Sequence, residues 1–378
     1  MKKEIILTED PNKELWNQFK QFENYGVCLN YLKENCKKFD NGKKFKPRAS
    51  LMKHYITQAK EYYFSARDSS VLTKPTLLYY GASCLVKALI IAKSCDYDHS
   101  TGHGMKVVKS DMDVLMDFRI KPVKGTFLQL YQVLENKNTN LIKSMDFNLE
   151  DLLSFIPELK DDFENIFDKK SLAIKVDRIK DEDGEYLFYE GDHFTDLSKF
   201  NDFINNIPNF DKYYVYPSFF SNGFSCFKKP MADEDIVLRN IMGEEFLVSS
   251  LQSGENSIYL SQITVHFLIL YLLSMLSRYY VNLWLGEESS DESRYFYIIE
   301  KFLDISERKF PNLVLNEILN KEIIFSIEYY KPSGFDFDEI KSMVEEIVNE
   351  AIEKNNSRNE KDEINRRFMD DIYNGRDW

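Results

Sequence analysis

The chain has 378 residues, of which 43% are hydrophobic, so it is long enough for two domains or for one large domain with an insertion. Its formal net charge of −13 argues against a protein that coats nucleic acid through its overall field, while a local basic patch stays open. The five cysteines are scattered without a CxxC pair, and the N-terminus lacks the apolar segment of a secretory signal. We therefore expect a cytoplasmic protein that does not bind membranes.

Helical patterns dominate the N-terminal half, residues 1–170. Thr8-Glu9-Asp10-Pro11 predicts the start of a first helix, and apolar residues at helical spacing predict another over 48–67. The pattern over residues 75–94 predicts a helix that is apolar over most of its circumference, with small side chains near Gly81 that let another helix approach closely. We expect the helix within 258–284 to pack against it. Lys87 lies within an apolar turn of this helix, so it either extends to the surface or serves a ligand.

The loop that follows, residues 95–125, is the most distinctive in the chain. It carries two carboxylates and two imidazoles close together: Asp96, Asp98, His99 and His103. These four side chains form a possible metal set, but no flanking element fixes a known ligand spacing, and we expect no metal. A glycine on each side of His103 makes the backbone flexible there. The alternatives are a structural turn in which the histidine bonds the backbone, and a ligand or catalytic role for His103.

The period of the pattern changes at residue 171. LAIKVDRI and YLFYE flank an Asp183-Gly184 turn, and DKYYVYPSFF and FSCFKK flank a Ser221-Asn222-Gly223 turn. Residues 171–230 therefore predict a small antiparallel sheet of two hairpins, inserted between two helical halves. Its edges need a cover, from the helical body or from a partner.

The second helical half, residues 231–335, is predicted to complete one core with the first. We expect a helical stretch around Arg239, a central helix within 258–284, and a helix over 314–330. The central helix is apolar on all faces for about a dozen residues, which predicts burial on all sides and is too short for a membrane span of about 20. Residues 336–378 predict a charged helix or tail.

Together these segments predict an α+β fold, predominantly an α-helical bundle with a small inserted antiparallel β-sheet. Two of them also resemble a known family. The segment KPTLLYYG from Lys74, continued by LVKAL, resembles the "kPlllYYg…L.KAl" segment of bacterial YaaC-like proteins. The segment from His266 to Trp284 resembles that family's "H…LSmlsRYyp..W" segment, with Val281 where members usually have proline. The resemblance spans roughly residues 14–330 and implies a shared fold. The family has no settled activity to carry over.

One functional hypothesis is an RNase related to the HEPN group of helical domains. Those enzymes use an Arg-x4-6-His pair, in which the arginine holds a phosphate and the histidine assists attack by the ribose hydroxyl. Arg48 and His54 match this spacing and are the candidate catalytic pair. At the central helix, Arg278 is followed six residues later by Trp284, where such a motif has histidine.

A second hypothesis is a non-enzymatic binding or regulatory protein. We expect the helical body to gather the candidate binding residues, which are Arg278, His266, His103, Lys87 and Tyr279. Arginine, lysine and histidine side chains suit an anion such as a nucleotide or a phosphate. His266 and Arg278 are 12 residues apart, over three turns of helix, so one small ligand is not expected to touch both.

A third hypothesis is an accessory or effector component of a bacterial phage-defence operon, without catalysis of its own. The sequence has no P-loop, dinucleotide fingerprint, serine elbow or zinc ribbon, so we expect no cofactor. The partners we expect are a protein partner or a second copy of the chain, with RNA or a nucleotide as candidate ligand.

Overall fold

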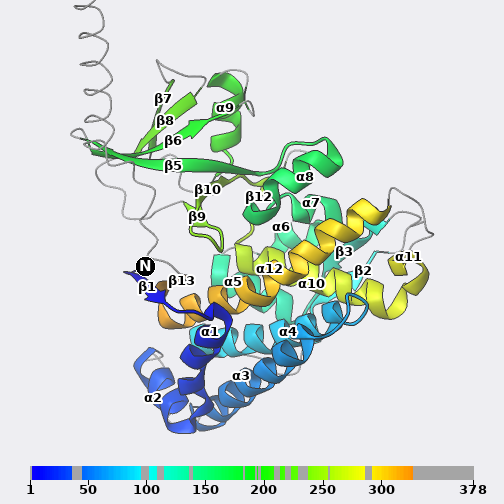
Figure 1. Ribbon diagram of the computed structural model, residues 1–378. Helices are drawn as coiled ribbons and strands as arrows, with labels where there is room; N and C mark the ends of the chain where they lie inside the picture. Colours follow the sequence, from blue (N-terminus) through cyan, green and yellow to red (C-terminus); the bar gives the residue numbers. More distant parts are fainter. Residues whose placement is uncertain are drawn as a thin grey trace, which may run out of the picture.

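Helix α10 (Gln262–Tyr279) runs through the middle of the helical body in the computed structural model (Figure 1). Every residue from Gln262 to Ser274 is buried. Ser261 caps the first turn, because its side chain accepts a hydrogen bond from the Thr264 N–H. The prediction of a central helix buried on all sides is confirmed.

The structure describes residues 2–35, 45–94, 102–108, 115–135, 139–181, 184–191, 194, 197–207, 213–217, 223–228, 237–253, 256–285 and 292–326. The fold is α+β and mostly helical, with small antiparallel sheets, as predicted. The charged tail expected over 336–378 lies outside the described residues.

Helix α4 (Lys74–Lys93) packs along α10, which confirms that prediction. Its small residues also face α3 (Phe45–Arg67), since a Cβ on Gly81 would lie 2.7 Å from the ring of Tyr63. The long helix α12 (Glu292–Leu319) packs on α4 as well. Among the described helices, α4 alone is long and apolar enough to cross a membrane, but 78% of that window is buried inside the protein, as in the core helix of a soluble protein.

The remaining helices are shorter and surround these four. They are α1 (Pro11–Phe19), α2 (Tyr25–Asn35), α5 (Thr126–Glu135), α6 (Thr139–Ser144), α7 (Leu149–Leu153), α8 (Lys160–Phe167), α9 (Leu197–Ile204) and α11 (Val281–Leu285). The predicted start of α1 is confirmed, because the Asp10 side chain accepts a hydrogen bond from the Lys13 N–H. The main hydrophobic core draws residues from both helical halves.

A six-stranded antiparallel sheet stands with α9 above the helical body in Figure 1, in the order β7-β8-β6-β5-β10-β9. Its strands are β5 (Ala173–Asp181), β6 (Gly184–Glu190), β7 (Tyr213–Pro217), β8 (Gly223–Lys228), β9 (Leu238–Arg239) and β10 (Glu245–Val248). Both predicted hairpins, β5–β6 and β7–β8, are confirmed. The sheet has a core of its own, in which Phe200 of α9 packs with Leu187 and Phe224.

The helical stretch predicted around Arg239 is wrong, since β9 and β10 come from that segment. Glu245 pairs with Val176 of β5, and all four residues of β10 are buried, so strand pairing with the inserted hairpins decides the local structure. Two smaller antiparallel sheets also occur among the described residues. One consists of β2 (Met105–Val107), β3 (Arg119–Pro122) and β4 (Phe147–Asn148), and the other of β11 (Leu251–Ser253) and β12 (Asn256–Ile258).

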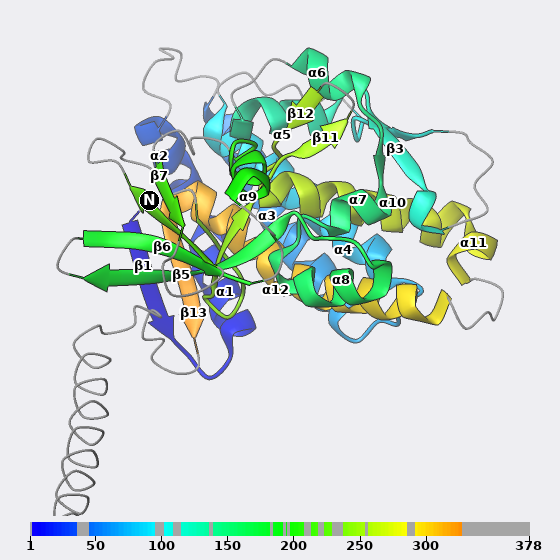
Figure 2. The ribbon, with the colours of Figure 1, turned by 90° about the horizontal axis from the view of Figure 1, so that it is seen from above.

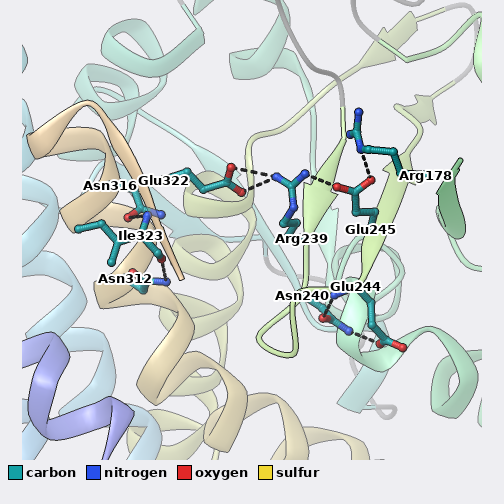
Figure 3. A network of polar contacts seen from close by, with 9 residues as sticks. All are labelled: Arg178, Arg239, Asn240, Glu244, Glu245, Asn312, Asn316, Glu322 and Ile323. Atoms are coloured by element: carbon teal, nitrogen blue, oxygen red, sulfur yellow. Dashed lines mark hydrogen bonds and ion pairs between the residues drawn. The ribbon is translucent and has the colours of Figure 1, made fainter. Parts of the chain in front are cut away.

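A chain of ion pairs joins the six-stranded sheet to Glu322, which follows α12 of the helical body (Figure 3). Arg239 of β9 donates to both carboxylate oxygens of Glu322, at 2.7 and 2.9 Å, and also pairs with Glu245. The other Glu245 oxygen accepts from Arg178 Nε of β5 at 2.8 Å. Arg239 and Glu245 are almost fully buried, so each charge depends on its partners.

Glu322 belongs to a strand that sequence patterns did not predict. The helix expected over 314–330 is wrong beyond Leu319: α12 runs through Pro311 and stops before Asn320, which has a left-handed φ of 52°. The chain then forms β13 (Lys321–Ser326), which pairs in parallel with β1 (Lys2–Leu7) at the other end of the sequence. Figure 2 shows the two strands side by side.

Candidate functional site

Tyr79 of α4 is the buried centre of a group of polar and aromatic side chains. It is fully buried, and its hydroxyl lies 2.6 Å from Nδ1 of His103. Its ring contacts that of Tyr271 on α10 edge-on, with 5.4 Å between centroids. Tyr271 in turn donates a hydrogen bond to the Met105 carbonyl of β2. The residues of three segments far apart in sequence therefore meet at Tyr79.

The loop that carries His103 is held against the start of α5. The carbonyl oxygens of Gly102 and His103 accept hydrogen bonds from the Thr126 and Phe127 N–H groups, at 3.0 and 3.1 Å. Gly104 has a φ of 82°, and a Cβ there would lie 2.8 Å from the Phe127 nitrogen. The glycine thus permits a close contact between the backbone of this loop and the start of α5. The other members of the considered metal set, Asp96, Asp98 and His99, lie outside the described residues.

The protonation states of this pair follow from their surroundings. The pKa of His103 is lowered by burial of part of the ring and by the positive charges of Lys87 and Arg278. The pKa of Tyr79 is raised, chiefly by burial. At neutral pH we therefore assign a neutral imidazole whose Nδ1 accepts from the Tyr79 hydroxyl, which leaves Nε2–H as a donor on an exposed side chain.

Arg278 lies in the last turn of α10 and faces α4. Its Nε donates to the Ser274 carbonyl at 2.9 Å, and Nη1 donates to the Tyr80 hydroxyl at 2.8 Å. The guanidinium also lies over the rings of Tyr80 and Tyr279, 5.4 and 5.0 Å from their centroids. These contacts orient the guanidinium at the edge of the buried core, and Tyr279 itself is 65% exposed.

Lys87 lies two turns along α4 from Tyr80, with its ammonium 5.4 Å from the centroid of the Tyr55 ring. In the part of the chain that the structure describes, neither Lys87 nor Arg278 forms an ion pair with a carboxylate. The other two lysines of α4 form ion pairs with carboxylates: Lys74 pairs with Asp304 and Glu307, and Lys93 pairs with Glu317. We call Tyr79, Tyr80, Lys87, His103 and Arg278 the tyrosine–arginine patch.

His266 lies apart from this patch, although it shares α10 with Arg278. It is fully buried, its Nδ1 lies 3.0 Å from the Ser306 hydroxyl of α12, and its ring contacts Phe302. Burial, with the nearby charge of Lys309, lowers the pKa of His266 well below its usual value. The structure therefore brings together Arg278, His103, Lys87 and Tyr279, and leaves His266 in the core.

The buried His266 makes the stability of the protein depend on pH. The unfolded chain binds a proton at a pKa near 6.5, while the native imidazole stays neutral well below that pH. The contribution of neutral His266 is complete above pH ~6.5 and falls by about 1.4 kcal/mol per pH unit below it, down to the folded pKa. We expect His266→Gln, whose amide can still bond Ser306, to lose this slope. Urea unfolding between neutral and mildly acidic pH measures it, and a constant stability difference between the two proteins would contradict the assignment.

The candidate nuclease pair on α3 is not side by side. Arg48 is 92% buried, and its guanidinium donates to the Ile91 and Ser94 carbonyls at the end of α4. Such contacts satisfy carbonyls that the helix leaves without N–H partners. His54 is exposed, six residues further along α3. Six residues correspond to about 600° of helix rotation, so the two side chains leave α3 in different directions.

Sequence reasoning missed the tyrosines of the patch. Tyr79 and Tyr80 stand within the YYG segment, but their periodicity is that of an apolar helix, and only the structure reveals that one bonds His103 and the other Arg278. No group of three or more His, Cys, Asp or Glu side chains suited to a metal ion occurs among the described residues.

A cavity of about 420 Å³ lies elsewhere, between α8 and the six-stranded sheet. Four of the charged residues that line it form ion pairs: Lys175 with Glu244 at 2.7 Å, and Lys160 with Glu164 at 3.4 Å. The tyrosine–arginine patch differs because its two cations lack such partners within the described chain.

The fold and the patch define a mostly helical α+β protein with a cationic, aromatic group where α4 and α10 meet. The chain belongs to the YaaC-like family: the family model described as YaaC-like protein matches residues 20–318. No curated protein and no solved structure matches it.

Proposed function

We propose that this YaaC-like protein is a non-enzymatic binding or regulatory component that takes an anionic ligand, a nucleotide or an RNA phosphate, at the tyrosine–arginine patch. The observation that carries the proposal is the pair of cations, Lys87 and Arg278, without carboxylate partners in the described chain, beside the imidazole of His103. The chain has a net charge of −13, so two neighbouring positive charges without carboxylate partners in the described chain stand out from its overall acidic character.

The chemistry of the patch suits a phosphate. Arg278 and Lys87 supply charge-assisted donors, and a bond of this kind contributes about 1.5–3 kcal/mol. The Nε2–H of neutral His103 adds a donor without a third charge. The exposed ring of Tyr279 offers a face on which a base can stack. These features favour a nucleotide or single-stranded RNA over a bare inorganic anion.

Titration of the full chain with three probes tests the proposal: inorganic phosphate, a mononucleotide, and a short single-stranded RNA. We expect saturable binding of the nucleotide or the RNA, weakened by salt, because phosphate contacts release counterions. Absence of binding for all three probes at low salt would contradict the proposal.

RNA cleavage at the same patch is the second candidate. It is favoured by the lowered pKa of His103, which leaves a neutral imidazole near a guanidinium, the combination of a general base and a phosphate clamp. The Arg48–His54 pair is the weaker nuclease candidate, because Arg48 is occupied by the carbonyls that end α4. If the wild type binds RNA and the RNA stays uncleaved, the non-enzymatic proposal is supported. If the wild type cleaves RNA and the His103→Ala variant does not, the alternative is supported.

The cellular setting that we propose is an accessory component of a bacterial phage-defence system, acting in the cytoplasm with a protein partner. The six-stranded sheet, which ends in the short strands β7 and β9, offers edges for such a partner. Purification of the tagged protein with its operon products tests this setting.

A further inference from the structure

Among the described residues, the two-stranded sheet β1–β13 is covered on one edge only. Side chains of α12 replace a third strand beside β13: Asn312 Nδ2 donates to the Ile323 carbonyl at 3.1 Å, and Asn316 Oδ1 accepts from the Ile323 N–H at 3.0 Å (Figure 3). Arg308 donates to the Phe325 carbonyl in the same way. The backbone of Ile323 and Phe325 therefore faces α12.

The backbone N–H and C=O groups of successive strand residues point to opposite edges of the strand. The backbone groups of Ile324 and Ser326 therefore point toward β1, and the Ser326 carbonyl does accept a hydrogen bond from the Thr8 N–H at 2.9 Å. On β1, the residues whose backbone faces β13 are accordingly the even-numbered ones. The N–H and C=O groups of Lys3, Ile5 and Leu7 point away from β13, toward an edge without a strand partner in the described chain.

The side chains on this edge are also unusual for a surface. Ile5 is 39% exposed and Leu7 is 55% exposed, on the same face of β1. A two-stranded sheet is marginal alone, and an edge strand with apolar side chains is a template for a further strand. Within the described part of the chain, this edge therefore combines backbone groups that lack a strand partner with exposed apolar side chains.

We propose that β1 pairs in antiparallel orientation with β1 of a second copy of the chain, which forms a four-stranded sheet across a twofold axis. Charge favours this occupant. Lys3 lies at the start of β1 and Glu9 just beyond its end, and neither forms an ion pair in the described chain. Antiparallel pairing brings Lys3 of one copy near Glu9 of the other, and it gathers both copies of Ile5 and Leu7 on one face.

Sedimentation velocity of the full chain over the micromolar range tests this pairing. We expect a reversible dimer for the wild type. Ile5→Pro removes a donor that points away from β13, so it should raise the dimer dissociation constant by about tenfold or more. Ile5→Val keeps the N–H and the branched side chain, and it should leave the dimer unchanged. Circular dichroism confirms the fold of each variant.

A charge swap tests the orientation. Lys3→Glu and Glu9→Lys should each weaken the dimer, and the double variant should restore it, because the swapped charges attract again. A wild type that stays monomeric, as it would with its own C-terminal segment on this edge, would overturn the proposal. A dimer insensitive to Ile5→Pro, or a double variant that is not rescued, would overturn it equally.

Discussion

Arg278→Ala is expected to weaken binding of a nucleotide or RNA by about 10- to 100-fold, which corresponds to the 1.5–3 kcal/mol of a charge-assisted hydrogen bond. The guanidinium is oriented toward the patch by Ser274 and Tyr80, so its loss removes a cation held in a defined direction. Arg278→Lys keeps the charge without the fork of donors, and an intermediate loss is expected. Isothermal titration against a short single-stranded RNA measures both effects.

The matched control for this experiment is Arg67→Ala on α3. Arg67 lies 3.6 Å from Glu307 and over the ring of Phe64, and neither of these contacts involves a residue of the patch. Removal of its charge changes the net charge of the chain as much as Arg278→Ala does, but the affinity should stay within about twofold of wild type. Equal losses for the two variants would mean that binding depends on overall charge, and the patch would then not be the site.

Lys309→Met is expected to destabilise the fold by about 3–5 kcal/mol, the cost of leaving a buried charge without its partner. Lys309 and Glu158 are 4% and 5% exposed, and Lys309 Nζ lies 2.6 and 2.8 Å from the two carboxylate oxygens. Glu158 also accepts from the Ile241 N–H at 2.9 Å, so this pair joins α12 to the segment before α8 and to the turn after β9. Urea denaturation measures the loss.

The double variant Lys309→Met, Glu158→Leu is the sharper comparison. Replacing both charges with apolar side chains removes the unpaired carboxylate, so most of the stability should return. About 1–3 kcal/mol should stay missing, because the Ile241 N–H loses its acceptor. If the single and double variants were equally unstable, the cost would come from packing and not from the charge.

Local sequence patterns correctly predicted the helices and hairpins whose formation depends on residues close together in the sequence. The apolar run of α10, the Asp10 cap of α1 and the two hairpins of the inserted sheet all follow from periodicity or turn chemistry within a few residues. The strands β1 and β13 do not, because their pairing joins residues more than 300 positions apart in the sequence. Residues 321–326 continue a helical pattern, and only the left-handed Asn320 and the partner strand redirect them.

The arrangement of the candidate site also depends on contacts between distant segments, which sequence patterns do not predict. The family-like segments contain Arg278 and Lys87, and the glycine-flanked loop contains His103. The structure places His103 against Tyr79 and Arg278 against Tyr80, and the charges of Lys87 and Arg278 lower the pKa of His103. His266 lies in the same segment as Arg278, but it faces Ser306 across the core, since 12 residues of helix separate the two side chains. Which face of a buried helix meets which neighbour depends on tertiary packing, and an apolar pattern on all sides carries no direction.

The measurement that tests the central claim most directly is an NMR titration of the His103 imidazole, with and without saturating nucleotide or RNA. In the free protein its pKa should lie below the usual value, because of burial and the charges of Lys87 and Arg278. An anion bound between these groups offsets the two positive charges, so the pKa should rise on binding, and affinity should increase as the pH falls. A His103 pKa that does not change at saturation would contradict binding at the tyrosine–arginine patch.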